Sequence, residues 1–254
     1  SQIITCHKEN DPRVQDPYCL RAMPQVLGAA IDTIEYVGRM VDRELGAVTD
    51  NPLVFSGEAD GPDGDAIISG GNFHGMPIAI ALDVLPIALA HIAGIAERRI
   101  FWLLSAFDLE NPVQPYLSPK SGLHSGLMIA QYTAAACCNE LQTLCAPASV
   151  ANIPTSAGIE DYNSMGATSA HQCRAAVNLA RTVAAIELLV MCEGMEYQRP
   201  LKSGDAVEQA HAAVRSMVKP LTGDRPPSPD IMSIERMIRD GRFDGIGPRL
   251  KLDG

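Results

Sequence analysis

Three polar segments of this chain carry side chains that could bind an amino acid and take a proton from it. In the first, Gln15 to Arg21, the arginine follows Tyr18 by three residues, so both side chains can face one side if the segment enters a helix. The planar fork of a guanidinium matches a carboxylate bidentately. Taken alone, Arg21 is more simply interpreted as a salt-bridged surface residue, so the other two segments decide its role.

The second segment is a glycine-rich loop, Ser69 to Gly75, with the sequence Ser-Gly-Gly-Asn-Phe-His-Gly. Glycines allow the backbone to approach other groups closely. Phe73 is either an aromatic contact for a ligand or a plug over the core. His74 could act as a base, but a structural hydrogen bond is its expected role.

The third segment, Ile153 to Gly166, places Ser156 and Glu160 in a polar stretch ahead of a predicted helix. A carboxylate near a helix start is commonly a cap that interacts with the helix dipole. The alternative is a catalytic carboxylate, which needs partial burial to raise its basicity toward the working pH. These residues alone leave both interpretations open.

Composition limits the class of protein. Hydrophobic residues make up 46% of the chain but aromatic residues only 5%, which favours packed helices over a β-sandwich. The net charge of -10 argues against nucleic acid as a partner. Seven cysteines without the spacing of a disulfide framework indicate a reducing cytoplasm. No Cys-x-x-Cys or His-x-x-x-His pair occurs, so no metal site is expected.

Apolar helical periodicity covers most of the chain. Long helices are predicted over 24–45, 77–104, 123–144 and 167–195, and shorter ones over 204–218 and 230–239. Helices of this length are typical of an elongated bundle, so the expected fold is all-α with loop-rich segments that carry the polar residues. Strand pairing is expected at most briefly, between Val54-Phe55 and Ala66 to Ile68.

The organisation follows from this pattern. Residues 1–13 are expected to be a tail or loop, 14–203 the core with its polar segments, and 204–254 the terminal helices. The stretch from Met76 to Ala96 is apolar enough to suggest a membrane span. Asp83, Pro86 and His91 interrupt it, so a central helix of a soluble bundle is expected, with no membrane partner.

Together the three segments resemble the C-terminal half of the histidine and aromatic amino-acid ammonia-lyases, and the histidine-specific members most strongly. The resemblance runs from about Val14 to the C-terminus. It implies that Arg21 binds the substrate carboxylate and that Tyr18, a catalytic residue, lies beside the electrophile. Gln15 matches a position that hydrogen-bonds in the same pocket.

The resemblance also implies a substrate class. Phe73 would pack against substrate and electrophile, and Glu160, the second catalytic residue, would lie near the ring and amine of histidine. Phenylalanine-specific members tend to carry lysine, glutamate and glutamine where this chain has Met128, Ser156 and Glu160. The implied reaction is therefore L-histidine to urocanate, with Met128 and Ser156 lining the pocket.

Two alternatives to the histidine reaction stay open. Tyr162 stands where the family usually has histidine, so the pocket could serve a lyase or aminomutase acting on an aromatic or modified amino acid. A non-catalytic helical scaffold or regulatory subunit is the other alternative. The presence of Tyr18, Arg21 and Glu160 together counts against it.

The electrophile is the part of the site that this sequence lacks. Members of the family make a methylidene-imidazolone group from an internal Ala-Ser-Gly triplet, and no such triplet occurs in these 254 residues. We therefore expect an N-terminal half or a companion chain to supply it, and activity only in that assembly. The resemblance further implies a homo- or hetero-oligomer with a tetrameric helical core, in which each site draws residues from three subunits.

Overall fold

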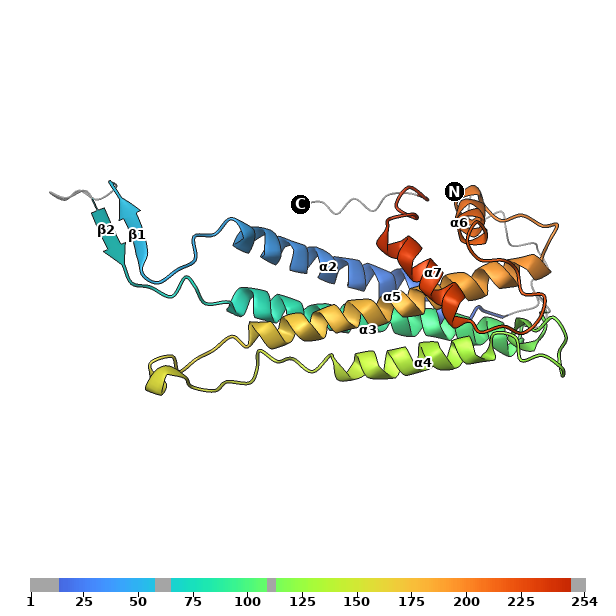
Figure 1. Cartoon of the computed structure of the whole chain (residues 1–254), viewed down its shortest axis with the longest axis horizontal. Coiled ribbons are helices and arrows are strands. Elements are labelled where there is room, and N and C mark those ends of the chain that lie inside the picture. Colours follow the sequence, from blue (N-terminus) through green and yellow to red (C-terminus); the bar gives the residue numbers. More distant parts are fainter. Residues whose placement is uncertain (1–13, 58–64, 109–112, 248–254) are drawn as a thin grey trace.

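The protein is an elongated bundle of long helices (Figure 1). The computed structural model describes residues 14–57, 65–108 and 113–247; the expected tail 1–13 and the last residues, 248–254, lie outside that range. The long helices are α2 (Met23–Leu45), α3 (Met76–Ser105), α4 (Met128–Thr143) and α5 (Gly166–Tyr197). With 30 residues, α3 is about 45 Å long at 1.5 Å per residue. The predicted all-α bundle is confirmed.

Shorter elements join and flank these helices. They are α1 (Tyr18–Arg21), η2 (Pro115–Leu117), η3 (Ser156–Gly158), α6 (Asp205–Arg215) and α7 (Ser228–Arg239). Strands β1 (Leu53–Ser56) and β2 (Asp65–Ile68) pair antiparallel, with Val54 opposite Ile67. This hairpin confirms the brief strand pairing that the sequence predicted.

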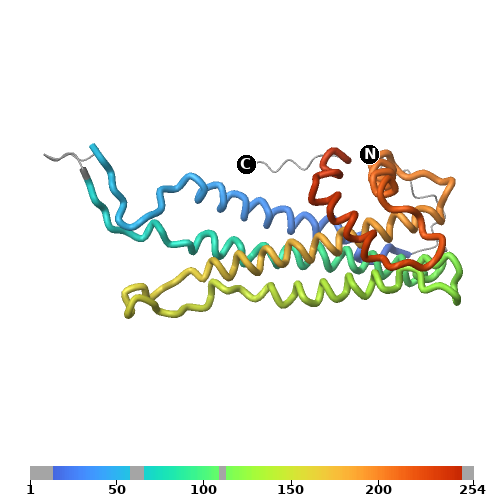
Figure 2. The backbone as a smooth tube through the Cα atoms, viewed as in Figure 1, coloured from blue at the N-terminus to red at the C-terminus, as the bar shows by residue number. Residues whose placement is uncertain are grey.

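The core lies where α3 and α5 run side by side, with α2 and α4 packed against them (Figure 2). Ile100 of α3, Leu141 of α4 and Ile186 of α5 are fully buried there. Alanines such as Ala96 and Ala176 let the helix axes approach closely, which is how a chain with few aromatic residues still packs a core. The result is a scaffold that spans the molecule from end to end.

The start of α4 differs from the prediction. The apolar pattern predicted a helix from Leu123, but α4 begins at Met128, because the residues before it form turns with Gly126 at φ +59°. The Asp224 carboxylate holds these turns by accepting hydrogen bonds from the backbone N–H groups of Ser125 and Gly126, each at 2.9 Å. Asp224 is distant in sequence, so local periodicity could not reveal this contact.

Two helices of the described part, α3 and α5, are long and apolar enough to cross a membrane by length and composition alone. The core helix of a soluble protein passes the same test. Asp83 and Glu97 in α3 and Glu193 in α5 are at most 5% exposed, because they pack against other parts of the chain. Pro86 lies inside α3 without ending it. The absence of a membrane partner stays a prediction.

The two ends of α3 carry different parts of the chain (Figures 1 and 2). The hairpin, the Ser69–Gly75 loop and the segment 144–165, which we call the α4–α5 connector, lie where α3 begins. Near the other end of α3, α1 packs beside Arg99 and Trp102. The three polar segments singled out in the sequence are therefore divided between the two ends of the bundle.

Candidate active site, divided between two ends of the bundle

Tyr18 and Arg21 face one side of α1, as their spacing predicted. The Arg21 guanidinium carbon lies 4.3 Å from the centroid of the Tyr18 ring, a distance typical of a cation–π contact. Arg21 Nε donates a hydrogen bond to the backbone oxygen of Asp16 at 2.9 Å. The two contacts orient the guanidinium before any ligand arrives, and an incoming carboxylate would meet its Nη edge.

These side chains border an open cavity of about 360 Å³. Its lining includes Gln15, Tyr18 and Arg21, together with Trp102 from α3. Tyr18 is 71% exposed, so its hydroxyl is accessible. The structure thus brings three of the predicted site residues together around one space.

Arg99 fixes α1 to the bundle, a role that the sequence analysis missed. Its guanidinium pairs with Glu187 of α5, and its Nη1 donates to the backbone oxygen of Cys19 at 3.4 Å. The last carbonyls of a helix have no partner within the helix, so a buried arginine can satisfy one of them. The only sequence signal was a pair of arginines at the end of an apolar run.

Glu160 and Ser156 lie in the α4–α5 connector, at the opposite end of the bundle. Thr155 and Glu160 form an isolated antiparallel bridge, with Thr155 N–H donating to Glu160 O at 2.9 Å. Glu160 Oε2 accepts a hydrogen bond from Thr155 Oγ1 at 2.9 Å. The carboxylate therefore belongs to a closed turn and does not cap α5, which begins six positions later at Gly166.

In the single chain, Glu160 lacks the partial burial that a catalytic carboxylate would need. Its side chain is exposed, because the turn projects past the end of the bundle (Figure 1). Ile159 beside it is 87% exposed and Tyr162 is 65% exposed. Partial burial of the Glu160 carboxylate would therefore require another part of the protein to pack over this turn.

Phe73 lies at the same end as Glu160 and is 51% exposed. Next to it, His74 Nε2 is 2.8 Å from the backbone oxygen of Tyr162, so Nε2 carries the hydrogen and donates it. This contact confirms the structural role expected for His74. It also ties the Ser69–Gly75 loop to the α4–α5 connector.

One chain therefore does not assemble the predicted site. Gln15, Tyr18 and Arg21 meet near the end of α3, whereas Phe73, Ser156 and Glu160 lie near its start; we call these the α1 group and the connector group. The length of α3 separates them by on the order of 40 Å. Met128, the partly buried first residue of α4, belongs to neither group.

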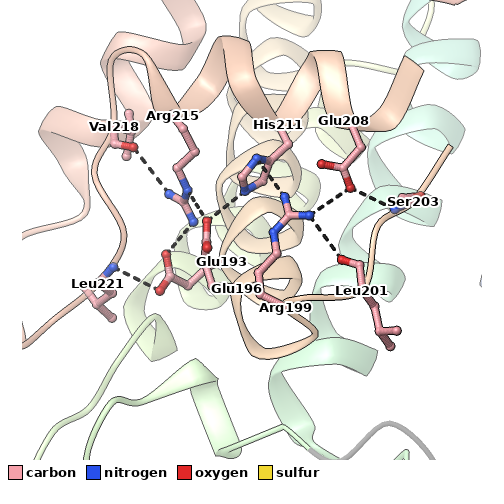
Figure 3. Close-up of polar contacts among 10 residues, drawn as sticks. All are labelled: Glu193, Glu196, Arg199, Leu201, Ser203, Glu208, His211, Arg215, Val218 and Leu221. Carbon is pink, nitrogen blue, oxygen red and sulfur yellow. Dashed lines mark hydrogen bonds and ion pairs between the residues drawn. The ribbon is translucent and has the colours of Figure 1, made fainter. Parts of the chain in front are cut away.

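A separate polar cluster joins α5 to α6 (Figure 3). Arg215 donates to Glu193 at 2.9 Å and to Glu196 at 2.8 Å, and His211 Nε2 donates to the same Glu196 oxygen at 2.8 Å. Glu208 accepts hydrogen bonds from Arg199 and from the Ser203 N–H group, at 3.0 and 2.8 Å. No predicted site residue takes part, and the cluster secures α6 on the bundle.

Acid should loosen α6. The Arg199 guanidinium and the Ser203 N–H group lower the pKa of Glu208 to about 2. Partial burial alone would raise the pKa of Glu196, but hydrogen bonds from Arg215 and His211 outweigh it and lower that pKa. Since both pKa values lie below the ordinary value of 4.5, their stabilisation is present above about pH 4.5 and is lost as the pH falls toward 2.

Hydrogen exchange of α6, corrected for intrinsic rates, measures this loss. Protection of residues 205–215 should fall between pH 4.5 and 2 faster than protection of α5. Glu208→Gln should flatten this dependence, whereas Glu140→Gln, an exposed carboxylate on α4, should leave it unchanged. Equal pH dependence in the wild type and in Glu208→Gln would contradict the assignment.

In the described part of the chain, no group of side chains could hold a metal ion, and the thiols of Cys138 and Cys192 have raised pKa values. No group of three or more His, Cys, Asp or Glu side chains in that part of the chain could hold a metal ion. Six cysteines there are free, and Cys6 lies outside it. Burial raises the pKa of the Cys138 and Cys192 thiols to about 11, so both stay protonated near neutral pH.

Sequence and structural comparisons agree on the class of protein. The chain belongs to the aromatic amino acid lyase family, whose family model matches residues 1–216. It is 45% identical to a histidine ammonia-lyase of Sorangium cellulosum over 98% of this chain and 49% of that protein. The chain thus spans about half the length of the curated relatives it matches.

Solved structures give the same fold. The histidine ammonia-lyase of Trypanosoma cruzi superposes with a TM-score of 0.85 at 39% identity, over 91% of this chain and 44% of that one. The tyrosine aminomutase of Streptomyces globisporus superposes with a TM-score of 0.84 at 33% identity, over 93% and 44%. The fold is therefore shared by proteins named for different reactions.

Proposed function

We propose that this chain supplies the C-terminal half of an ammonia-lyase that converts L-histidine to urocanate and ammonia. The observation that carries the proposal is the α1 group, in which Arg21 and Tyr18 are held together on one open cavity. The relatives named histidine ammonia-lyase support the choice of reaction. The reducing cytoplasm that the free cysteines favour is its proposed location.

Arg21 binds the substrate carboxylate in this proposal. The contacts to Asp16 O and to the Tyr18 ring preset the guanidinium, so little orientational freedom is lost when the carboxylate docks at the Nη edge. A bidentate pair between Arg21 and the carboxylate also fixes the direction in which the rest of the substrate extends from Arg21. The clamp thereby holds the α- and β-carbons in the cavity that Arg21 shares with Tyr18.

Tyr18 accepts the β-proton. The reaction breaks the Cβ–H and Cα–N bonds, and the electron pair of the Cβ–H bond becomes the new Cα=Cβ bond. Tyr18 and Arg21 line one cavity, so a carboxylate held by Arg21 would set the distance from the Tyr18 side chain to the β-carbon. Positioned proton transfer of this kind typically contributes about 10²- to 10⁴-fold to a rate.

The family electrophile fits beside the α1 group but cannot be made from this chain. Its Ala-Ser-Gly source is absent from the 254 residues, whereas the exposed Tyr18 hydroxyl and the Gln15 amide offer polar groups to a neighbour. When bound, the methylidene-imidazolone withdraws electrons from the substrate amine. Residues outside this chain supply it, from an N-terminal half or a companion chain.

The separation of the two groups leads to an oligomer. A site that needs Arg21 and Glu160 together cannot form within one chain, because the length of α3 separates them. A second copy packed antiparallel brings its connector group to the α1 group of the first copy, and twofold symmetry then completes two sites at once. The exposed Phe73 and Tyr162 are covered in the same step. We propose that such pairs build the tetrameric core.

Specificity for histidine is assigned to the connector group. Glu160 can accept a hydrogen bond from an imidazole N–H, which phenylalanine lacks, and Ser156 stands in the same turn. Met128 belongs to neither group within one chain, so another subunit of the proposed core would bring it to the pocket as a flexible apolar contact. A site built around such a bond rejects analogues without it, because its polar group is then left unpaired.

An aromatic or modified amino acid is the second candidate substrate. The similarity to a tyrosine aminomutase of Streptomyces globisporus favours it, as does the exposed Tyr162 beside Glu160. In that case the reaction could end in an ammonia-lyase product or in return of the amine to the β-carbon. A non-catalytic scaffold would not need Tyr18 and Arg21 preset on a cavity.

The substrate preference tests the proposal. In the complete assembly, kcat/KM should be higher for histidine than for phenylalanine or tyrosine. Glu160→Gln should lower the value for histidine by on the order of 10²-fold and narrow the preference, because the buried imidazole loses its charged acceptor. Urocanate, cinnamate and coumarate are each followed by their absorbance.

Asp161→Asn is the matched control, because it removes the neighbouring carboxylate of the same turn. It should leave the histidine preference in place. A preference for phenylalanine or tyrosine in the wild type would overturn the histidine assignment and favour the second candidate.

A further inference from the structure

Asp83 is a carboxylate inside the apolar helix α3, two turns after its start, and only 5% of it is exposed. Its Oδ2 accepts a hydrogen bond from the backbone N–H group of Ser149 at 2.8 Å. Burial alone would raise the pKa of Asp83, but hydrogen bonds, chiefly from Ser149, outweigh it and lower the pKa. The group is therefore an anion that holds a backbone amide inside the bundle.

Ser149 belongs to the α4–α5 connector, which is held together by hydrogen bonds within it. Asn163 N–H donates to Asn152 Oδ1 at 3.0 Å, and Asn152 Nδ2 donates back to Asn163 O at 2.9 Å. This reciprocal pair closes a loop around the Thr155–Glu160 bridge. Where the base of such a loop is held decides where Glu160 lies.

Besides a contact of Cys145 Sγ with the backbone oxygen of Pro86, two hydrogen bonds hold that base near the start of α3. Asp83 binds the connector at Ser149, before the loop, and His74 binds it at Tyr162 O, just after Glu160. Of the two, only the Asp83 contact comes from a buried charge within a long helix. Hydrogen bonds to charged groups are roughly twice as strong as neutral ones, so Asp83 is the stronger anchor.

We propose that Asp83 is a positioning residue that sets the place of Glu160 in the assembled site. Asp83 does not touch the substrate; it acts through Ser149 and the closed loop of the connector. The proposal rests on the proposed function for its catalytic consequence. Its structural part, the anchoring of the connector, stands on the contacts alone.

Asp83→Ala in the complete assembly tests both parts. Amide exchange over 150–163 should become on the order of tenfold faster, whereas exchange over α1 should not change. In an active enzyme, the ratio of kcat/KM for histidine over phenylalanine should narrow, because a displaced Glu160 no longer serves the imidazole. Asp83→Asn, whose amide oxygen still accepts the bond, should restore most of both values.

Glu97→Gln is the matched control. Glu97 is also a buried carboxylate of α3, 3% exposed, but it accepts a hydrogen bond from Gln131 of α4 at 2.9 Å and so ties α3 to α4. Its loss should lower stability without loosening the connector selectively or changing the substrate ratio. A purely structural role for Asp83 would make the two variants behave alike.

The outcomes separate the two proposals. Unchanged exchange over 150–163 in Asp83→Ala, or an unchanged substrate ratio in an active enzyme, would overturn the role of Asp83. Absence of turnover in the wild-type assembly would overturn the proposed function and leave the exchange result to judge the anchor. If Asp83→Ala does not assemble, Ser149→Pro carries the test, because it removes the N–H donor of the same contact; exchange over 150–163 no faster than in Glu97→Gln would then overturn the anchor.

Discussion

Arg21→Met in the complete assembly should lower kcat/KM by on the order of a thousandfold. The substitution removes the partner of the substrate carboxylate, and breaking a buried ion pair by removing one member costs about 3–5 kcal/mol. Steady-state kinetics with histidine measures the loss. Stability should change little, because Arg21 is exposed and its contacts among the described residues are one backbone oxygen and the Tyr18 ring.

Two further variants make the Arg21 result specific. Arg21→Lys keeps the charge but loses the planar fork, so it should recover only part of the activity. Arg39→Met removes an exposed arginine paired with Glu35 on the next helix, and it should have near-normal kinetics. Near-normal kinetics in Arg21→Met, or a protein that simply unfolds, would return Arg21 to a structural role.

Local patterns predicted the helical architecture well. The long apolar stretches became α2, α3 and α5 within two residues of their predicted bounds, because their periodicity is a local signal, as are the prolines at the starts of α2 and α3. The predicted start of α4 was wrong because it depends on a contact that is distant in sequence. Asp224, about a hundred residues away, stabilises the turns that precede it.

The site was predictable in its parts and not in its arrangement. The spacing of Tyr18 and Arg21 gave their shared face correctly, since neighbours on one helical turn need no tertiary information. The exposure of Glu160 could not be predicted, because burial depends on what packs over a turn. The α1 group and the connector group lie at opposite ends of the bundle, and only the structure of α3 with the segments that join it shows this.

The positioning residues left weak signals in the sequence. In the sequence, Asp83 is a charged residue that interrupts an apolar stretch, and this argued against a membrane span. The sequence did not indicate which group Asp83 contacts. Its partner is a backbone amide of the connector, and a backbone donor has no sequence signature. The same holds for Arg99, whose contact to α1 is the backbone oxygen of Cys19.

We propose that these 254 residues hold the substrate-handling half of a lyase site, whereas the electrophile comes from residues outside them. Without an Ala-Ser-Gly triplet the chain should show no turnover of histidine above background. Joined or co-expressed with a family N-terminal half that carries the triplet, it should form urocanate. The same N-terminal half with its triplet serine changed to alanine is the control, because it assembles without making the electrophile.

Urocanate absorbance with histidine, followed for the purified chain and for both assemblies, is the most direct measurement. Intact mass analysis of each sample confirms which chains are present. Product is expected only in the assembly with the unchanged triplet. Turnover by the 254-residue chain alone, or an inactive assembly whose mass shows both halves present, would contradict it.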